Sequence, residues 1–210
     1  MALTTDQLVD DGPVIPVILL DRATDAVPLA RALLAGGVRV LEITLRTAAA
    51  LEAIGLVREQ CPEAIVGAGT VRSPAELAAA HAAGAQFIVS PGLTAAVSRA
   101  AAEAGLPLLP GAVTASEIMQ AMDLGHRLLK FFPASAVGGP AALRALASPF
   151  ADVNFCPTGG IDPANAADYL GLPNVRCVGG SWLTPRKLID AGAWDQITAL
   201  ARASRGLCQT

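Results

Sequence analysis

Two charged residues, Glu42 and Lys130, lie well inside segments that are patterned as buried strands. A buried charge is costly unless it is paired or functional, and a structural ion pair or a lysine that reaches solvent is the ordinary explanation. The chain, however, uses thirteen arginines and only two lysines, Lys130 and Lys187. Because arginine cannot lose its proton, a lysine at position 130 favours nucleophilic, Schiff-base chemistry.

Strand alternation predicts that both groups point toward one interior. Polar residues recur at every second position from Glu42 to Arg46, and the residues between them are leucine and isoleucine. The apolar face must meet helices, so the polar face looks inward, and the same rule turns Lys130 inward. We expect apolar neighbours and one nearby cation to keep a useful fraction of its amine uncharged: Leu128, Phe132, Phe155 and Arg46.

Two glycine pairs supply a second candidate site. Thr158-Gly159-Gly160 and Gly179-Gly180-Ser181 each follow a short apolar segment late in the chain. Paired glycines let backbone N–H groups approach an anion closely. Either pair alone is typical of an ordinary tight turn. Two pairs at matching positions, with a serine hydroxyl added, favour a phosphate site.

Eight short apolar segments must position these residues. They recur at similar intervals, at residues 14–20, 38–45, 65–69, 86–90, 107–111, 128–132, 153–157 and 175–179. Helical spacing fills the stretches between them, with predicted starts at Ser73-Pro74, Thr94, Ser116 and Asp162-Pro163 and a terminal helix over 185–207. Eight strand and helix units predict a (β/α)8 TIM barrel of the α/β class, with working groups at the carboxyl ends of the strands. An open doubly wound sheet is the alternative.

Composition and charge indicate how many domains the chain has and which classes of function are excluded. No linker divides residues 1–210, so we expect a single barrel domain with an N-terminal extension and a C-terminal helix. The net charge of -3, with both signs interspersed, offers no basic stripe for nucleic acid and no patch for a membrane. The acidic start is unlike a secretory signal, and no apolar run is long enough to cross a bilayer. We therefore expect a cytoplasmic protein.

Cysteine and histidine usage argues against a metal centre. The four cysteines form no C-x-x-C pair and are expected to be reduced thiols: Cys61, Cys156, Cys177 and Cys208. Only two histidines are present, His81 and His126, so a three-histidine zinc site cannot be assembled.

Six segments together resemble the KDPG/KHG aldolase family, the 2-dehydro-3-deoxy-phosphogluconate aldolases of the Entner-Doudoroff pathway. The segments are GGVRVLEITLRT at 36–47, IVGAGTV at 65–71, FIVSPG at 87–92, LKFFPA at 129–134, FCPTGGI at 155–161 and VGGSWL at 178–183. The resemblance implies a Schiff-base aldolase that needs no metal or cofactor, yields pyruvate and assembles as a homotrimer.

The resemblance also implies roles for single residues. Lys130 would form the Schiff base and Glu42 would act as general acid and base. Arg46 and Thr70 would hold the pyruvyl carboxylate, Pro91 and Phe132 would shape the pocket around the pyruvyl part, and Gly159, Gly160, Gly180 and Ser181 would bind the phosphate. Thr158 and Gly179, which belong to the same two glycine segments, are predicted to bind the substrate with them. Two positions, Val113 and Ser135, depart from the residues that some relatives carry, and both bear on substrate choice rather than on imine formation.

Alternatives to this function stay open at the level of sequence. Lys130 and Glu42 would serve equally well on 4-hydroxy-2-oxoglutarate or on the galactonate epimer. An isomerase or epimerase could use Glu42 as a base on the same barrel, with Lys130 as an electrostatic partner. A noncatalytic phosphosugar-binding protein is a further possibility.

Overall fold

The protein is described here by a computed structural model, which covers residues 3–207. Seven of the eight predicted strand segments contain a strand, and the last, 175–179, overlaps one. The strands are β1 (Val14–Ile18), β2 (Val40–Thr44), β3 (Ile65–Gly69), β4 (Ile88–Val89), β5 (Leu108–Leu109), β6 (Leu128–Phe131), β7 (Asn154–Pro157) and β8 (Val178–Gly180). The α-helices are α1 (Thr5–Asp10), α2 (Ala26–Ala35), α3 (Ala50–Gln60), α4 (Pro74–Ala82), α5 (Ala95–Glu103), α6 (Ala115–Asp123), α7 (Gly139–Leu146), α8 (Ala166–Leu170), α9 (Arg186–Asp190) and α10 (Trp194–Arg205).

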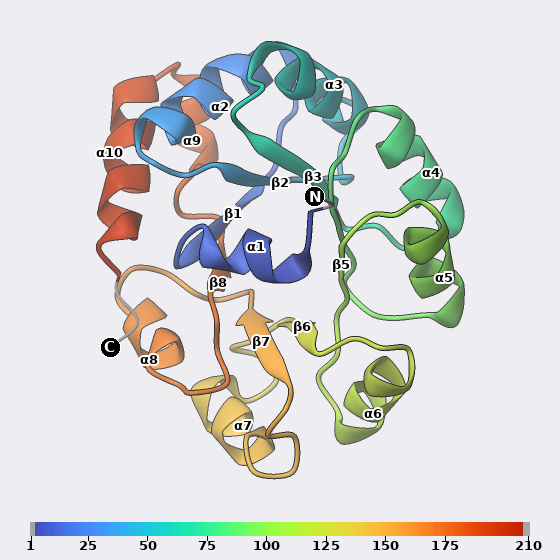
Figure 1. Cartoon of the computed structure of the whole chain (residues 1–210). Helices are drawn as coiled ribbons and strands as arrows, with labels where there is room; N and C mark the ends of the chain where they lie inside the picture. Colours follow the sequence, from blue (N-terminus) through green and yellow to red (C-terminus); the bar gives the residue numbers. More distant parts are fainter. Residues whose placement is uncertain (1–2, 208–210) are drawn as a thin grey trace.

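The strands form a curved parallel sheet with helices on its outer side (Figure 1). Six strands pair in the order β5-β4-β3-β2-β1-β8, and β6 pairs with β7. Backbone contacts border the β6–β7 pair on both sides. Gly111 bridges to Lys130 on one side, and Phe155 bridges to Val175 on the other. The chain is thus an α/β protein whose parallel strands curl around an interior.

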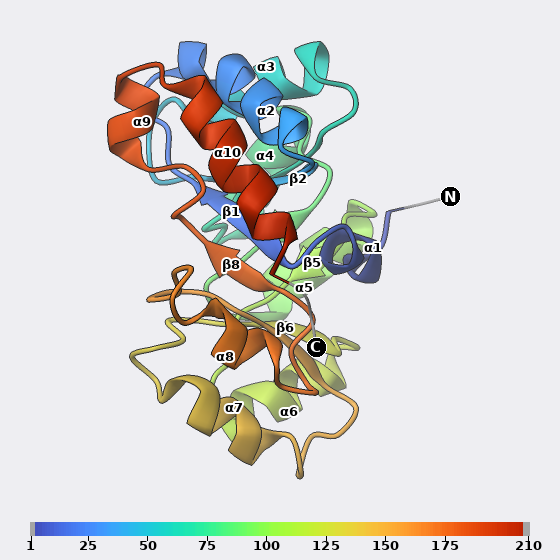
Figure 2. The same cartoon turned by 90° about the vertical axis from the view of Figure 1, so that its left-hand side faces the viewer.

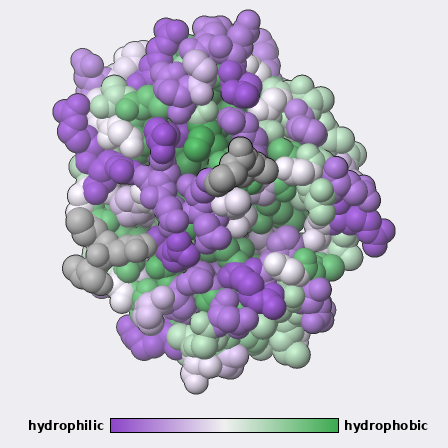
Figure 3. Space-filling model, viewed as in Figure 1, coloured by the Kyte–Doolittle hydropathy of each residue, from purple (hydrophilic) through white to green (hydrophobic). Residues whose placement is uncertain are grey.

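Helix α1 covers the end of the sheet where the strands begin. Its buried residues Leu8 and Val9 join an inner apolar cluster whose other buried members come from seven of the strand segments: Ile15, Val40, Phe87, Val89, Leu109, Leu128, Cys156 and Cys177. Figures 1 and 2 place α1 across this end, and Figure 3 shows a mainly hydrophilic surface over it. The interior is therefore closed to water at its amino end.

Ion pairs link α1, and the residue that follows it, to arginines that precede two of the strands. Arg39, directly before β2, pairs with Asp11, and Arg176, shortly before β8, pairs with Asp6 and Asp10. These pairs lie at the rim, where exposed ion pairs add little free energy each. The burial of Leu8 and Val9 is the larger contribution to holding the helix.

The predicted helix starts hold at two positions and fail at a third. Ser73 and Thr94 cap α4 and α5, each accepting a hydrogen bond from a backbone N–H three residues on. The prediction at Ser116 is wrong because Thr114 caps α6. The Thr114 hydroxyl accepts from the Glu117 N–H, and the Glu117 carboxylate accepts from the Thr114 N–H. The reciprocal arrangement satisfies two otherwise unpaired donors.

Two further boundaries differ from the predictions. Asp162 opens a turn instead of a helix, since its side chain accepts from the N–H groups of Ala164 and Asn165, and α8 begins only at Ala166. The predicted helix over 185–207 is two helices, α9 and α10. The chain turns between them at Gly192, whose φ of 61° lies in the left-handed region.

Candidate active site

A cavity of about 240 Å³ opens at the carboxyl ends of the strands. Side chains and backbone from most of the strand ends line it: Val17, Glu42, Arg46, Thr70, Pro91, Lys130, Phe132, Thr158, Gly159, Gly160, Ile161, Gly179 and Ser181. Every predicted site residue except Gly180 is among them. The residues lie at the end of the sheet opposite α1, and ligands of parallel α/β sheets bind at the carboxyl ends of the strands.

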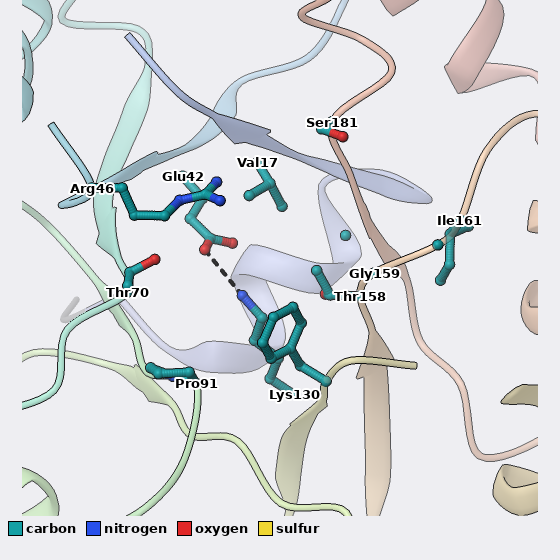
Figure 4. A pocket seen from close by; sticks show the side chains of 13 residues that line it. Val17, Glu42, Arg46, Thr70, Pro91, Lys130, Thr158, Gly159, Ile161 and Ser181 are labelled. Carbon is teal, nitrogen blue, oxygen red and sulfur yellow. Dashed lines mark hydrogen bonds and ion pairs between the residues drawn. The ribbon is translucent and has the colours of Figure 1, made fainter. Parts of the chain in front are cut away.

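Glu42 and Lys130 meet at the centre of the cavity (Figure 4). Lys130 Nζ lies 3.1 Å from Glu42 Oε1, and the two side chains are 7% and 3% exposed. The residues that flank them in β2 and β6 point the other way, into the helix-facing core: Leu41, Ile43, Leu129 and Phe131. Alternation along two separate strands therefore brings the only close acid and amine of the cavity lining into contact.

A glycine makes room for the acid. Gly69 lies opposite Thr44 in the register of β3 and β2, and a Cβ at Gly69 would fall 2.2 Å from Glu42 Oε1. No side chain can occupy that position without displacing the carboxylate. The sequence offers the glycine but gives no sign that its empty space holds Glu42.

The surroundings of the amine match the prediction in part. Lys130 Nζ lies 5.4 Å from the centre of the Phe132 ring, and Leu128 lies on the inner side of the same strand. Phe155 was predicted as a neighbour, and this is wrong. Its ring packs edge to face against Phe131, with 6.0 Å between centres, in the helix-facing core. Cys156, one residue later, is the register partner of Lys130.

One end of the cavity carries a cation and a hydroxyl. Arg46 Nε donates to the Thr44 hydroxyl at 3.1 Å, and that hydroxyl donates to the Ile18 carbonyl at 2.8 Å. Thr70 has a φ of 61°, which is costly for a β-branched residue. Figure 4 shows Arg46, Thr70 and Pro91 on the same side of the Lys130 amine. This end can bind a carboxylate.

The other end is formed by glycine-rich backbone. Gly159 and Gly160 have φ values of 100° and 74°, and in Figure 4 Gly159, Ile161 and Ser181 lie across the cavity from Thr70. Within residues 3–207, the N–H groups of Gly160 and Ile161 donate to no protein acceptor. Unpaired N–H groups beside a cavity suit an anion.

The second glycine pair is placed differently from the prediction. Gly179 and Gly180 belong to β8 itself instead of following it, because regular pairing with β1 begins only at Val178. Gly179 packs against Thr158, where a Cβ would fall 2.2 Å from the hydroxyl oxygen. Gly180 faces the Trp182 ring and is the predicted residue that does not line the cavity.

Two lining residues were not predicted. Val17 is the register partner of Glu42 and shares its face, so alternation along β1 would have identified it. Ile161 follows the glycine pair directly. Apolar residues carry no chemical signal in a sequence, and only their place in the fold marks them.

Thiols and histidines lie outside this arrangement. Cys61, Cys156 and Cys177 are buried free thiols, and Cys208 lies outside the described residues. A hydrogen bond with Cys156, together with burial, raises the pKa of the Cys177 thiol well above its ordinary value. His126 contacts the Ser98 hydroxyl at 2.8 Å, away from the cavity. Across residues 3–207, no group of three or more His, Cys, Asp or Glu residues could hold a metal ion, and no helix could span a membrane.

A sequence model described as "KDPG and KHG aldolase" matches residues 5–200 of the chain. The chain belongs to this aldolase family. It is 56% identical over 199 residues to the 2-dehydro-3-deoxy-phosphogluconate aldolase of Dickeya dadantii, and 55% identical over 199 residues to the KHG/KDPG aldolase of Escherichia coli K12. Each match covers 95% of this chain and 93% of the relative. The resemblance seen in the sequence is confirmed.

Solved structures of aldolases share the fold. The KDPG aldolase of Legionella pneumophila, with pyruvate captured at low pH as a covalent carbinolamine intermediate, superposes with a TM-score of 0.95 at 44% identity. That match covers 97% of this chain and 99% of the other. The Zymomonas mobilis ZM4 enzyme with 3-phosphoglycerate gives a TM-score of 0.92 at 47% identity, covering 98% and 96%.

Proposed function

We propose that this protein is a class I aldolase that cleaves 2-dehydro-3-deoxy-6-phospho-D-gluconate to pyruvate and D-glyceraldehyde 3-phosphate, a step of the Entner-Doudoroff pathway. The single observation that carries the proposal is the buried contact of 3.1 Å between Lys130 Nζ and Glu42 Oε1 in the cavity. The family membership and the named activities of relatives at 50–56% identity support it.

The proposed reaction begins at the amine. Uncharged Lys130 attacks the C2 ketone of the substrate, and Glu42, within hydrogen-bonding reach, transfers the protons that let the carbinolamine lose water and become an iminium ion. The iminium then accepts electrons from the C3–C4 bond. Glu42, directly or through a water molecule, takes the proton of the C4 hydroxyl as that bond breaks.

Product release reverses the first steps. Glyceraldehyde 3-phosphate leaves, the enamine of pyruvate is protonated at C3, and water hydrolyses the imine to restore Lys130. The scheme uses neither a metal nor an organic cofactor. The protein contributes placement of the two groups and a site with restricted access to water, which strengthens the electrostatic interactions.

The two ends of the cavity fit the two charged ends of this substrate. We assign the pyruvyl carboxylate to Arg46 and Thr70, with Pro91 and Phe132 shaping the pocket around the pyruvyl group. The phosphate is assigned to the unpaired N–H groups of Gly160 and Ile161 after β7 and to the Ser181 hydroxyl after β8. Thr158, Gly159 and Gly179 line the same end of the cavity. Gly180, which was predicted to bind the phosphate as well, faces the Trp182 ring and does not line the cavity.

We also propose that the eight strands close into one (β/α)8 barrel domain spanning residues 1–210. Hydrogen bonds on both sides of the β6–β7 pair support closure: Lys130 N donates to Pro110 O, and Phe155 N donates to Asn174 O, both at 2.8 Å. A homotrimer in the cytoplasm remains our prediction for its assembly and location, and size-exclusion chromatography with light scattering would test the trimer.

A second substrate, 4-hydroxy-2-oxoglutarate, is favoured by one observation. The Escherichia coli relative is named KHG/KDPG aldolase. That substrate would use Lys130, Glu42 and the carboxylate end but would leave the glycine-rich end without a phosphate. Comparing kcat/KM on the two substrates, and on the galactonate epimer, decides which of them the chain prefers.

Borohydride reduction in the presence of pyruvate tests the proposal directly. The chain has only two lysines, Lys130 and Lys187, so Lys187→Arg is a matched control for Lys130→Arg. Peptide mapping by mass spectrometry should find one reduced pyruvyl adduct, on Lys130, in the unchanged protein and in Lys187→Arg. Lys130→Arg should lack the adduct and lose turnover. An adduct that persists in Lys130→Arg, or an active Lys130→Arg protein, contradicts the scheme and favours an isomerase or a binding protein.

A further inference from the structure

The side chain of Asn165 braces the first glycine loop from outside the cavity. Its Nδ2 donates to the Gly160 carbonyl at 2.9 Å, and its Oδ1 accepts from the Asp162 N–H at 3.0 Å. Asp162 in turn fixes the backbone of Asn165, because its Oδ1 accepts from the Asn165 N–H at 3.3 Å. One amide group thus holds both sides of Ile161 in place.

Fixing a carbonyl also fixes the N–H group of the same peptide. In a trans peptide the C=O and the N–H of the next residue point in opposite directions. The Gly159 carbonyl accepts from the Ser135 N–H at 3.1 Å, which orients the Gly160 N–H, and the Gly160 carbonyl accepts from Asn165, which orients the Ile161 N–H. Both N–H groups lack a protein acceptor within residues 3–207, and both residues line the cavity.

The loop needs such a brace because its own conformation is permissive. Gly159 and Gly160 both have positive φ, a region that glycine enters and leaves at little cost. A flexible loop must lose conformational entropy when it binds an anion, and that loss weakens binding. An external hydrogen bond that orders the loop beforehand removes part of the loss.

We propose that Asn165 is a positioning residue for the phosphate end of the substrate, acting through the Gly160 peptide without touching the ligand. This inference rests on the proposed function, in which the glycine loop receives the phosphate. The role requires a donor and an acceptor in one short side chain, which an amide supplies. Aspartate keeps the acceptor but loses the donor to the Gly160 carbonyl, and alanine loses both.

The test compares substrates with and without a phosphate. In Asn165→Ala, the KM for the phosphorylated substrate should rise by roughly 3- to 10-fold, the range that one hydrogen bond contributes, with kcat nearly unchanged. The inhibition constant of inorganic phosphate should rise in parallel. The kcat/KM for 4-hydroxy-2-oxoglutarate, which has no phosphate, and the pyruvyl adduct on Lys130 should not change. Asn165→Asp should show the same pattern.

Asn174→Ala is the matched control. Asn174 is buried and its Nδ2 donates to the Leu143 carbonyl at 2.8 Å, but it does not line the cavity. Its loss should lower the melting temperature without changing the ratio of the two kcat/KM values. Equal losses on both substrates in Asn165→Ala, or an unchanged KM for the phosphorylated substrate, overturn the inference.

Failure of the proposed function would look different. An unchanged protein that turns over neither substrate refutes the aldolase, whereas the role of Asn165 can still be measured by calorimetry with inorganic phosphate. Weaker phosphate binding in Asn165→Ala than in the unchanged protein then supports the positioning role, and equal binding refutes it.

Discussion

The interior of the sheet has two layers of opposite character, although the same strands supply both. On β2, Val40 belongs to the apolar layer near α1, and Glu42 belongs to the polar layer in the cavity. On β6, Leu128 and Lys130 divide in the same way. Two residues along a strand span about 6.6 Å. The apolar layer near α1 and the Glu42–Lys130 pair are therefore only one inward-facing residue apart on each strand. Among the described residues, the buried charged residues are Glu42 and Lys130, and both lie in the polar layer.

Gly67 and Gly69 express the same contrast on a third strand. A Cβ at Gly67 would fall 2.5 Å from the Phe87 ring, in the apolar layer, and one at Gly69 would meet the Glu42 carboxylate. Glycine is required at both positions because another side chain occupies the space that a Cβ would need. In the apolar layer the Phe87 ring fills the space, and in the polar layer the Glu42 carboxylate fills it.

The largest expected effect comes from removing the acid of the polar layer. Glu42→Gln keeps the shape and a hydrogen bond to Lys130 but cannot exchange a proton, so kcat should fall by roughly 10²–10⁴-fold. Steady-state kinetics with the phosphorylated substrate measures this, and the melting temperature should change little. A variant that keeps most of its activity would mean that another group moves the protons.

A substitution in the apolar layer near α1 should lower the stability of the fold and leave the catalytic rate unchanged. Leu8 is 2% exposed, and Leu8→Ala should lower the free energy of unfolding by about 2–4 kcal/mol, measured by urea denaturation. The kcat of the folded protein should stay the same. Leu51→Ala, at a position that is 37% exposed, is the control and should cost less than about 0.5 kcal/mol.

The two glycines give the sharpest comparison within one strand. Gly67→Ala should lower the free energy of unfolding by about 1–3 kcal/mol through overpacking against Phe87. Gly69→Ala should instead displace the Glu42 carboxylate and lower kcat by roughly 10–100-fold. If both variants change kcat alike, or stability alike, the two layers do not act as separate units.

The smallest effect is expected from a histidine outside both layers. Burial lowers the pKa of His126 below 6.5, so the folded protein keeps this ring neutral more readily than the unfolded chain does. The neutral ring therefore contributes to the free energy of unfolding above pH 6.5, and this contribution is lost as the pH falls through the lowered pKa. Melting temperatures at pH 7.5 and 5 should therefore differ less in His126→Gln than in the unchanged protein. An identical difference would mean that His126 does not take part.

Strand alternation was enough to predict the central pair. Charged residues at alternate positions among leucines and isoleucines leave one consistent orientation, and the orientation of two strands brings Glu42 to Lys130. The glycine loop after β7 was predicted for a different reason. A glycine pair alone is typical of an ordinary tight turn, and only the second pair at a matching position, with the Ser181 hydroxyl, favoured an anion site.

Features that depend on three-dimensional neighbours were beyond the same reasoning. Phe155 was placed beside the amine because its strand was known but its face was misjudged by one residue, and one residue reverses the side. The start of α6 was misplaced although the Thr114 and Glu117 spacing is a recognised capping pattern. The position of α1 at the amino end of the sheet follows from contacts between distant segments and leaves no local pattern. The Asn165 amide contacts Asp162 and Gly160, three and five residues away, but no known sequence pattern marks an asparagine that orders a glycine loop.

Thr70 holds a backbone conformation that a β-branched residue adopts only at a cost of about 1–3 kcal/mol. Glycine or asparagine would accept the same φ with less strain, yet neither would offer the same hydroxyl to the cavity. Laboratory evolution for heat resistance alone is thus expected to discard this threonine early, whereas evolution that also rewards turnover should retain it. At this position we expect selection for heat tolerance and selection for turnover to favour different residues.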